Sequence, residues 1–339
     1  YACESNNLEL VKYLIPLDID INWKDGNERT VLHYLCRNGN LEIVRHISNI
    51  AEANFDVKDE NERTLLHEAC LSGNVALVKF LVEIGGVDIL AKDKKNQTLL
   101  HESFDNLQLL QYLISLNSRA VNEIDNNGNT VFLKAVNYGN AHIIEYLVSN
   151  PEVDITIQNK NKKNALHLLI ENDNLQLFKY LVNLNKIPLN QTDKSKNTLL
   201  HYACRNRNSN ILKYIIKFNE IDLNAKNENN ETLLHITSSN GYLESTQYLV
   251  SLGQIDILAK DNDDKTILHN ACNSNNLELI QYLVSLDKFD VNAQTKSKNT
   301  PLHFAIQQEN LLSVKYLTSL PEINLKIKTN NEKKLNKTK

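Results

Sequence analysis

Polar and apolar residues follow one pattern along the chain, and the pattern returns about every 34 residues. In residues 59–92, the apolar side chains at 65–70 and again at 75–82 have the spacing of one face of a helix. The Gly-Asn pair at 73–74 separates these two stretches, because Gly accepts a left-handed turn and Asn can begin a new helix. A polar segment at 93–96 follows. We therefore predict two short antiparallel helices and an extended polar tip in each repeat.

A Thr-x-Leu-His motif marks the beginning of the first helix in most repeats. The threonine hydroxyl can accept a backbone N–H of the first helical turn, and Pro301 stands at a position where no N–H is needed. The motif begins at Thr30, Thr64, Thr98, Thr198, Thr232, Thr266 and Thr300. Its spacing divides the chain into a partial repeat (1–24), nine repeats (25–58, 59–92, 93–124, 125–158, 159–192, 193–226, 227–260, 261–294 and 295–328) and a Lys/Asn-rich tail (329–339), which we expect to be frayed.

A helical hairpin of this size cannot bury its own apolar faces, so the copies must stack on one another. We therefore predict one elongated all-α body instead of two or three globular domains. The tetratricopeptide repeat has a similar period of about 34 residues. It would require two longer helices and no extended tip, whereas here a polar segment follows every second helix.

The chain resembles the ankyrin repeat family over essentially its whole length. The family's Thr-Pro-Leu-His motif is intact at 300–303, and the Gly-Asn pairs at 39–40, 73–74 and 139–140 match its turn between helices. Asp-Ile-Asn at 20–22 matches its hairpin stem. The resemblance implies an ankyrin-repeat solenoid of helix-turn-helix units joined by extended, β-hairpin-like tips. It also implies that the motif histidine bonds within its own Thr-x-x-His turn and ties neighbouring tips together.

Three repeats depart from the pattern. The repeat at 93–124 is two residues shorter than its neighbours, Leu133 replaces the motif histidine, and Asn164 replaces the motif threonine. Two explanations stay open: drift in a protein that needs only average stability, or a local change of curvature near residues 100–135 that separates two binding surfaces.

Composition and charge exclude several classes of function. The net charge is −4 with acids and bases interspersed, so we expect no nucleic-acid partner, and no apolar stretch approaches the length of a membrane span. The chain starts inside a repeat and contains no Met, so we expect it to be part of a longer protein. Five cysteines share one repeat position, where partners about 10 Å apart cannot form disulfides; this favours the cytoplasm, or the nucleus.

The candidate chemistry belongs to the repeat. His33 and Cys36 are spaced i, i+3, as are the equivalent pairs in three other repeats, but each pair lies about 10 Å from the next. That distance is too long to complete a tetrahedral zinc site. The sequence contains no Gly-rich phosphate loop, nucleophile elbow or His-Glu-x-x-His motif. We therefore expect no metal, no cofactor, no small-molecule substrate, no catalytic residue and no enzymatic activity.

The resemblance implies that a partner binds on the concave face, which is built from the tips and the exposed side of each first helix. Residues that vary between repeats at these positions are the informative ones, and Tyr, Trp and Arg dominate interface hot spots. The candidate partner-binding residues are Trp23, Tyr34, Arg37, Glu68, Tyr138, Tyr202, Arg205 and Phe304. We expect a non-enzymatic scaffold or adaptor that holds another protein or a peptide. The alternative is a regulatory or autoinhibitory arm of a larger enzyme or channel.

Overall fold

The computed structural model describes residues 8–14, 17, 20–49, 53–85 and 88–330. Most of the predicted tail (329–339) and part of the predicted N-terminal repeat (1–24) therefore lie outside the described residues. The chain forms two compact units, 1–168 and 169–339, and each is described by itself.

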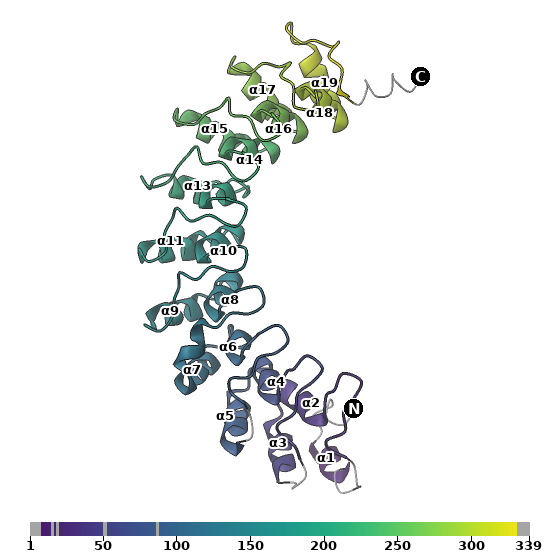
Figure 1. Cartoon of the computed structure of the whole chain (residues 1–339), viewed down its shortest axis with the longest axis vertical. Coiled ribbons are helices and arrows are strands. Elements are labelled where there is room, and N and C mark those ends of the chain that lie inside the picture. The colour runs from purple at the N-terminus through teal and green to yellow at the C-terminus, as the bar shows by residue number, and fades with distance from the viewer. Residues whose placement is uncertain (1–7, 15–16, 18–19, 50–52, 86–87, 331–339) are drawn as a thin grey trace. The chain divides into compact units, whose positions relative to one another are not determined.

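Short helices follow one another in pairs in the first unit (Figure 1). They are α1 (Leu8–Leu14), α2 (Val31–Arg37), α3 (Leu41–Ser48), α4 (Leu65–Ser72), α5 (Val75–Ile84), α6 (Leu99–Glu102), α7 (Leu107–Leu116), the 3-10 helix η2 (Ser118–Asn122), α8 (Val131–Tyr138) and α9 (Ala141–Ser149). Helix α10 (Ala165–Glu171) contains the boundary between the units.

The second unit has the same construction. Its helices are α11 (Leu175–Asn183), α12 (Leu199–Ala203), α13 (Asn210–Ile215), α14 (Leu233–Ser239), α15 (Leu243–Ser251), α16 (Ile267–Asn273), α17 (Leu277–Ser285), α18 (Pro301–Gln307) and α19 (Leu311–Thr318). The described residues contain no β-strand, so the predicted all-α fold is confirmed; a single antiparallel bridge between Lys58 and Thr64 is the nearest feature to a hairpin stem.

The helix boundaries lie where the capping residues predict them. The hydroxyl of Thr64 accepts the backbone N–H of His67 at 3.4 Å and begins α4. Gly73 ends α4 with φ +71°, a left-handed conformation that glycine adopts without steric conflict. Asn74 then begins α5 by accepting the backbone N–H of Leu77 at 3.1 Å. The two apolar stripes thus face each other, and Leu65 and Leu77 are completely buried between them.

Each repeat begins with a five-residue turn, which we call a tip. In the tip at 59–63, the backbone N–H of Asp59 donates to the carbonyl of Arg63 at 3.0 Å, and the Asp59 carboxylate accepts the backbone N–H of Asn61 at 2.8 Å. The tips of the first unit are residues 25–29, 59–63, 93–97, 125–129 and 159–163.

A backbone hydrogen bond joins each tip of the first unit to the preceding tip. Four N–H groups donate to carbonyl oxygens at 2.8–2.9 Å: Glu60 to Asn27, Lys94 to Asn61, Asn126 to Lys95, and Lys160 to Asn127. The five tips therefore form one continuous row with a fixed register. Side chains add further bonds between some tips: Nδ2 of Asn96 donates to Oδ1 of Asn126 at 2.7 Å, and Nδ2 of Asn126 donates to the carbonyl of Lys94 at 3.0 Å.

The repeat at 93–124 has a shortened first helix. Helix α6 has four residues, whereas α4 in the preceding repeat has eight. The hydroxyl of Ser103 donates to the carbonyl of Leu99 at 2.7 Å. This bond gives a partner to one of the carbonyl groups that the end of the helix leaves without a backbone donor. The two-residue deletion thus removes one helical turn, and Phe104 occupies the resulting bend.

Candidate functional site

The motif histidines hold neighbouring tips together. The backbone N–H of Thr64 donates to Nδ1 of His67 at 3.2 Å, so this nitrogen carries no proton. The protonated Nε2 therefore donates to the carbonyl oxygen of Gln97 in the next tip, 3.1 Å away. Equivalent bonds to the next tip join His101 to Asn129, His201 to Glu231, and His235 to Lys265. The role implied by the resemblance is confirmed for these repeats.

Burial keeps these histidines neutral. It lowers the pKa of His33, His67, His101, His201 and His235 below the ordinary value, and it lowers the pKa of His269 to about 4. A neutral imidazole is required because Nδ1 must accept a hydrogen bond in the fold. In His67, where both ring nitrogens have protein partners, neither nitrogen is left for a substrate.

The cysteines are buried within the repeats. Cys36, Cys70, Cys204 and Cys272 are unpaired, and burial raises the pKa of each thiol above its ordinary value. Cys3 lies outside the described residues. Across the described ranges, no three His, Cys, Asp or Glu side chains gather in a way that could hold a metal ion.

Two predicted partner-binding residues are highly accessible. The side chains of Trp23 and Tyr138 are 66% and 68% exposed. Trp23 occupies the stem position at which Ala91 and Ala259 are buried, so its exposure could not be inferred from the equivalent positions. Tyr138 ends helix α8, and Gly139 turns the chain directly after it with φ +74°.

Two tyrosines at one repeat position differ in exposure. The hydroxyl of Tyr34 donates to the carboxylate of Asp25 at 2.6 Å, and that of Tyr202 donates to Asp193 at 2.6 Å. Tyr34 stays partly accessible, whereas Tyr202 is only 3% exposed. The expectation that Tyr202 is exposed is therefore wrong, because its ring packs inside the repeat to reach the aspartate.

Glu68 is also buried, with 3% exposure, so the prediction of an exposed position is wrong here too. Two arginines enclose its carboxylate: Arg63 Nε donates to it at 2.7 Å, and Arg37 Nη1 donates from the preceding repeat at 3.1 Å. The Arg37 side chain itself is 55% exposed.

The remaining two candidates are partly covered by neighbours. The guanidinium of Arg205 lies 5.1 Å from the centre of the Tyr202 ring and donates to Oδ1 of Asn197 at 3.0 Å. Phe304 is half-buried, with its ring edge-on to the His269 ring at 5.7 Å. Both side chains therefore contribute to packing within the second unit.

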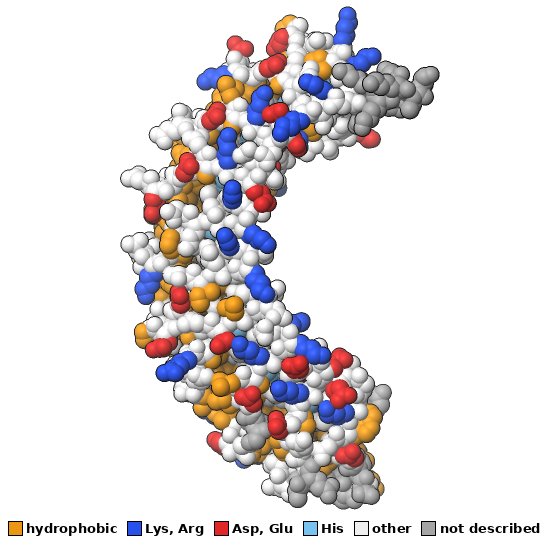
Figure 2. All heavy atoms as spheres, in the orientation of Figure 1, with side chains coloured by type: hydrophobic (Ala, Val, Ile, Leu, Met, Phe, Trp, Pro, Cys, Tyr) orange, Lys and Arg blue, Asp and Glu red, His pale blue; other side chains and the backbone are white. Residues whose placement is uncertain are grey.

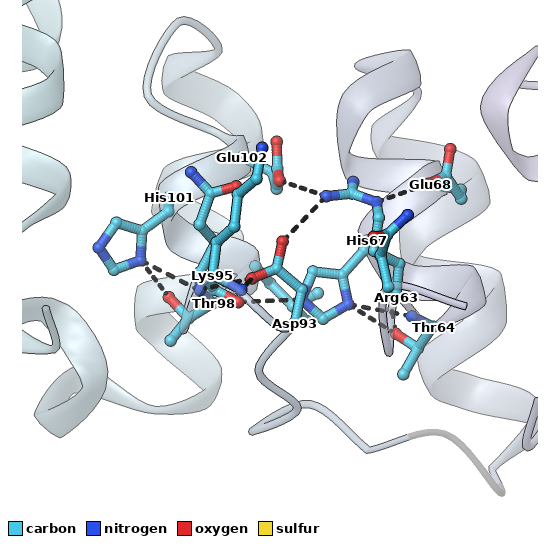
Figure 3. Close-up of polar contacts among 12 residues, drawn as sticks. Arg63, Thr64, His67, Glu68, Asp93, Lys95, Thr98, His101 and Glu102 are labelled. Atoms are coloured by element: carbon cyan, nitrogen blue, oxygen red, sulfur yellow. Dashed lines mark hydrogen bonds and ion pairs between the residues drawn. The ribbon is translucent and has the colours of Figure 1, made fainter. Parts of the chain in front are cut away.

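A buried charge network centred on Arg63 connects the repeats at 59–92 and 93–124 (Figure 3). Besides Glu68, the guanidinium donates to Glu102 at 2.8 Å and to Asp93 at 3.3 Å. Burial alone lowers the pKa of Arg63, but the Glu102 and Glu68 carboxylates raise it above its ordinary value. Sequence reasoning missed this network, although glutamate directly after the motif histidine in two adjacent repeats was a visible signal.

An aromatic pair lies beside this network, where the short helix α6 ends. The rings of Phe104 and Tyr138 are 4.3 Å apart between centroids and tilted by 38°. Lys134 lies 5.1 Å from the Phe104 ring and donates to the carbonyl of His101 at 2.9 Å. Sequence reasoning did not single out Phe104, and the two-residue deletion before it was the signal available. The pair joins the short repeat to the next one through the half-buried ring of Phe104 and the exposed ring of Tyr138.

No helix within the described ranges combines the length and the apolar character that crossing a membrane requires. A comparison with curated proteins gives no match. The family model for ankyrin repeats (3 copies) matches residues 1–93, 98–193, 166–261 and 234–329. These matches, the paired helices and the histidine bonds between tips show that the chain belongs to the ankyrin repeat family.

Proposed function

We propose that the chain is a non-enzymatic scaffold or adaptor that holds a partner protein or peptide on the face formed by the tips and first helices. Ankyrin repeats are generally protein-interaction modules and typically non-catalytic. The exposed Tyr138 ring, held against Phe104 at 4.3 Å, is the observation that carries the proposal for this chain. An aromatic side chain fixed by a neighbour loses little conformational freedom on binding, and tyrosine is enriched at interface hot spots.

Trp23 and Arg37 support the same surface. Trp23 offers a second exposed aromatic ring, and Arg37 is held by Glu68 but keeps half of its side chain accessible. Glu68 supports this surface indirectly, because its carboxylate positions Arg37. In the second unit, taken by itself, the ring of Tyr202 positions the exposed Arg205 in the same way. Phe304 has less exposed surface to offer a partner.

The experiment selects peptides from a random display library on the immobilised wild-type chain and measures their affinities in solution. Tyr138→Ala is expected to lower the affinity of the selected peptides by about tenfold or more, because truncation of a hot-spot side chain has effects of this size. Tyr13→Ala is the matched control. Tyr13 in α1 is 70% exposed, but it belongs neither to a tip nor to a helix that begins with the Thr-x-Leu-His motif. Equal affinities for wild type and Tyr138→Ala would refute the proposed surface.

We also propose that this binding takes place in the cytoplasm or nucleus. The four buried, unpaired thiols support a reducing compartment. Localisation of the tagged full-length protein tests this, and secretion into an oxidising compartment would contradict it.

A further inference from the structure

The outward charges of the first unit are separated along the row of tips. The tip at 59–63 carries the exposed acids Glu60 and Glu62, and the tip at 93–97 carries the exposed bases Lys94 and Lys95. In Figure 2, acidic side chains lie among some Lys and Arg along the edge beside α2, and Lys and Arg side chains continue along the same edge toward α8.

Buried ion pairs remove the opposite charges from the acidic tips. Arg29 donates to the buried Asp59 at 3.3 Å. The side chain of Arg63 is only 12% exposed and forms ion pairs with Glu68, Asp93 and Glu102. The tip at 59–63 therefore presents a negative charge to a partner, because Glu60 and Glu62 are exposed whereas Arg63 is held in the buried ion pairs.

The aspartates of the basic part of the row are also buried. Asp93 is buried and accepts the backbone N–H groups of Lys95 and Gln97, both at 2.8 Å. Asp125 is buried in the next tip and accepts the N–H groups of Asn127 and Asn129. Both carboxylates lie buried beneath their turns, so a partner on the outside contacts the lysines and not these acids.

Four exposed lysines remain on the basic part of the row. Lys94 and Lys95 lie in the third tip, and Lys160 and Lys162 lie in the fifth. None of the four ammonium groups forms an ion pair with another described residue. The tip between them, at 125–129, has no exposed acid. This arrangement leaves a basic stretch whose four ammonium groups are available to the acidic side chains of a partner.

We propose that the first unit binds an extended peptide segment with divided charge, its acidic part over Lys94, Lys95, Lys160 and Lys162 and its basic part over Glu60 and Glu62. The proposal rests on the protein-binding function above and names the class of partner. Charge complementarity of this kind fixes register and rejects wrongly charged partners. A nucleic acid is negative throughout, so the acidic tips would repel part of it.

The length of the segment follows from the row. From the second tip to the fifth there are three steps of about 10 Å, the usual spacing of packed helices. An extended chain rises about 3.3 Å per residue, so roughly ten residues span the charged tips. The aromatic pair of the half-buried Phe104 and the exposed Tyr138 lies within the same repeats and can receive an apolar side chain from the middle of the segment.

The test compares two synthetic peptides of about twelve residues with identical composition. The first has four aspartates at one end, four arginines at the other and Leu and Tyr between them; the second alternates Asp and Arg around the same centre. We expect the divided peptide to bind the wild-type chain about tenfold more tightly at low salt, because each exposed ion pair contributes modestly and several must act together. Equal affinities of the two peptides would overturn the proposal.

Two sets of variants locate the effect. Each set is expected to lower the affinity of the divided peptide to that of the alternating peptide. The first set is Lys94→Gln/Lys95→Gln/Lys160→Gln/Lys162→Gln, and the second is Glu60→Gln/Glu62→Gln. Lys296→Gln/Lys298→Gln, in a tip of the second unit, is the matched control and should leave the affinity unchanged. Carbodiimide crosslinking should join the peptide aspartates to the four lysines, whereas crosslinks elsewhere would contradict the assignment.

The remaining outcomes separate this proposal from the proposed function. Library peptides whose binding depends on Tyr138 but which carry no divided charge would refute the inference and leave the function standing. Displacement of the divided peptide by a single-stranded oligonucleotide at equal concentration would overturn it in favour of a nucleic-acid site. If neither selected nor designed peptides bind, both proposals fail.

Discussion

Arg63, in the second tip, donates from Nη1 to Oε1 of Glu102 in the next repeat at 2.8 Å, and this bond closes a buried network of one cation and three acids. Arg63→Leu would leave Glu68, Asp93 and Glu102 buried without their main counter-charge. We expect a loss of about 3 kcal/mol, the range seen when one partner of a buried ion pair is removed.

Urea unfolding followed by circular dichroism measures this loss. Arg37→Leu is the control, because Arg37 binds the same Glu68 carboxylate from a half-exposed position and should change stability by less than about 1 kcal/mol. Similar losses in both variants would show that the network does not depend on Arg63.

The buried histidines make stability fall in mild acid. Burial lowers the folded-state pKa of His269 from the ordinary 6.5 to about 4, so the unfolded chain binds the proton first as pH falls. The stabilisation is therefore complete above pH 6.5 and is lost as pH falls toward 4. For His269 alone the loss is roughly 3 kcal/mol, at about 1.4 kcal/mol per pKa unit.

Thermal unfolding between pH 7.5 and 4.5 measures this dependence. The His269→Gln variant should be less stable than the wild type at pH 7.5. Its stability should depend less on pH, because no group at this position then takes up a proton. Parallel profiles for wild type and His269→Gln would contradict this account.

Gly128 allows two tips to approach closely. Its φ is +78°, and a Cβ atom there would lie 2.6 Å from the backbone nitrogen of Lys160, which bonds to the carbonyl of Asn127. Gly128→Ala should therefore destabilise the chain by about 2 kcal/mol through backbone strain and steric conflict. Gly26→Ala, where the added carbon meets nothing within 4 Å, should change stability by less than about 0.5 kcal/mol. An unchanged midpoint for Gly128→Ala in urea would exclude the close approach.

Tyr202 and Tyr34 form the same bond in different surroundings. Both hydroxyls donate to an aspartate at 2.6 Å, but Tyr202 is buried and Tyr34 is partly exposed. Hydrogen bonds to charged groups contribute about 1.5–3 kcal/mol, and the full amount applies only where water cannot replace the lost partner. Tyr202→Phe should therefore reduce the unfolding free energy by about 2 kcal/mol, and Tyr34→Phe by less than half as much. Equal losses would mean that burial does not strengthen the bond.

The fold could be predicted because its signals are local and repeated. Thr64 and Asn74 act as caps, and Gly73 ends a helix, whatever the neighbouring repeat contains. The shortened helix α6 likewise follows from two missing residues. Agreement among many copies compensates for any one ambiguous position. The division into nine repeats with the stated boundaries stays a prediction.

The candidate site could be predicted only in part, because exposure depends on side chains from adjacent repeats. Glu68 is buried since Arg63 and Arg37 both reach it, whereas its position alone indicates a surface residue. Phe104 became part of the surface through the tilted contact with Tyr138 in the following repeat. Such contacts join residues about 30 positions apart, and helical periodicity carries no information about them.

The main-chain bonds between successive tips have a consequence for protein engineering. Since Glu60, Lys94 and Lys160 donate their backbone N–H groups to the preceding tip, any residue except proline can stand at these three positions and keep the same bond. Asn126 differs, because its side chain also donates to the carbonyl of Lys94 at 3.0 Å. A combinatorial library randomised at the three positions would change which ligands are recognised while each member retained the parent architecture.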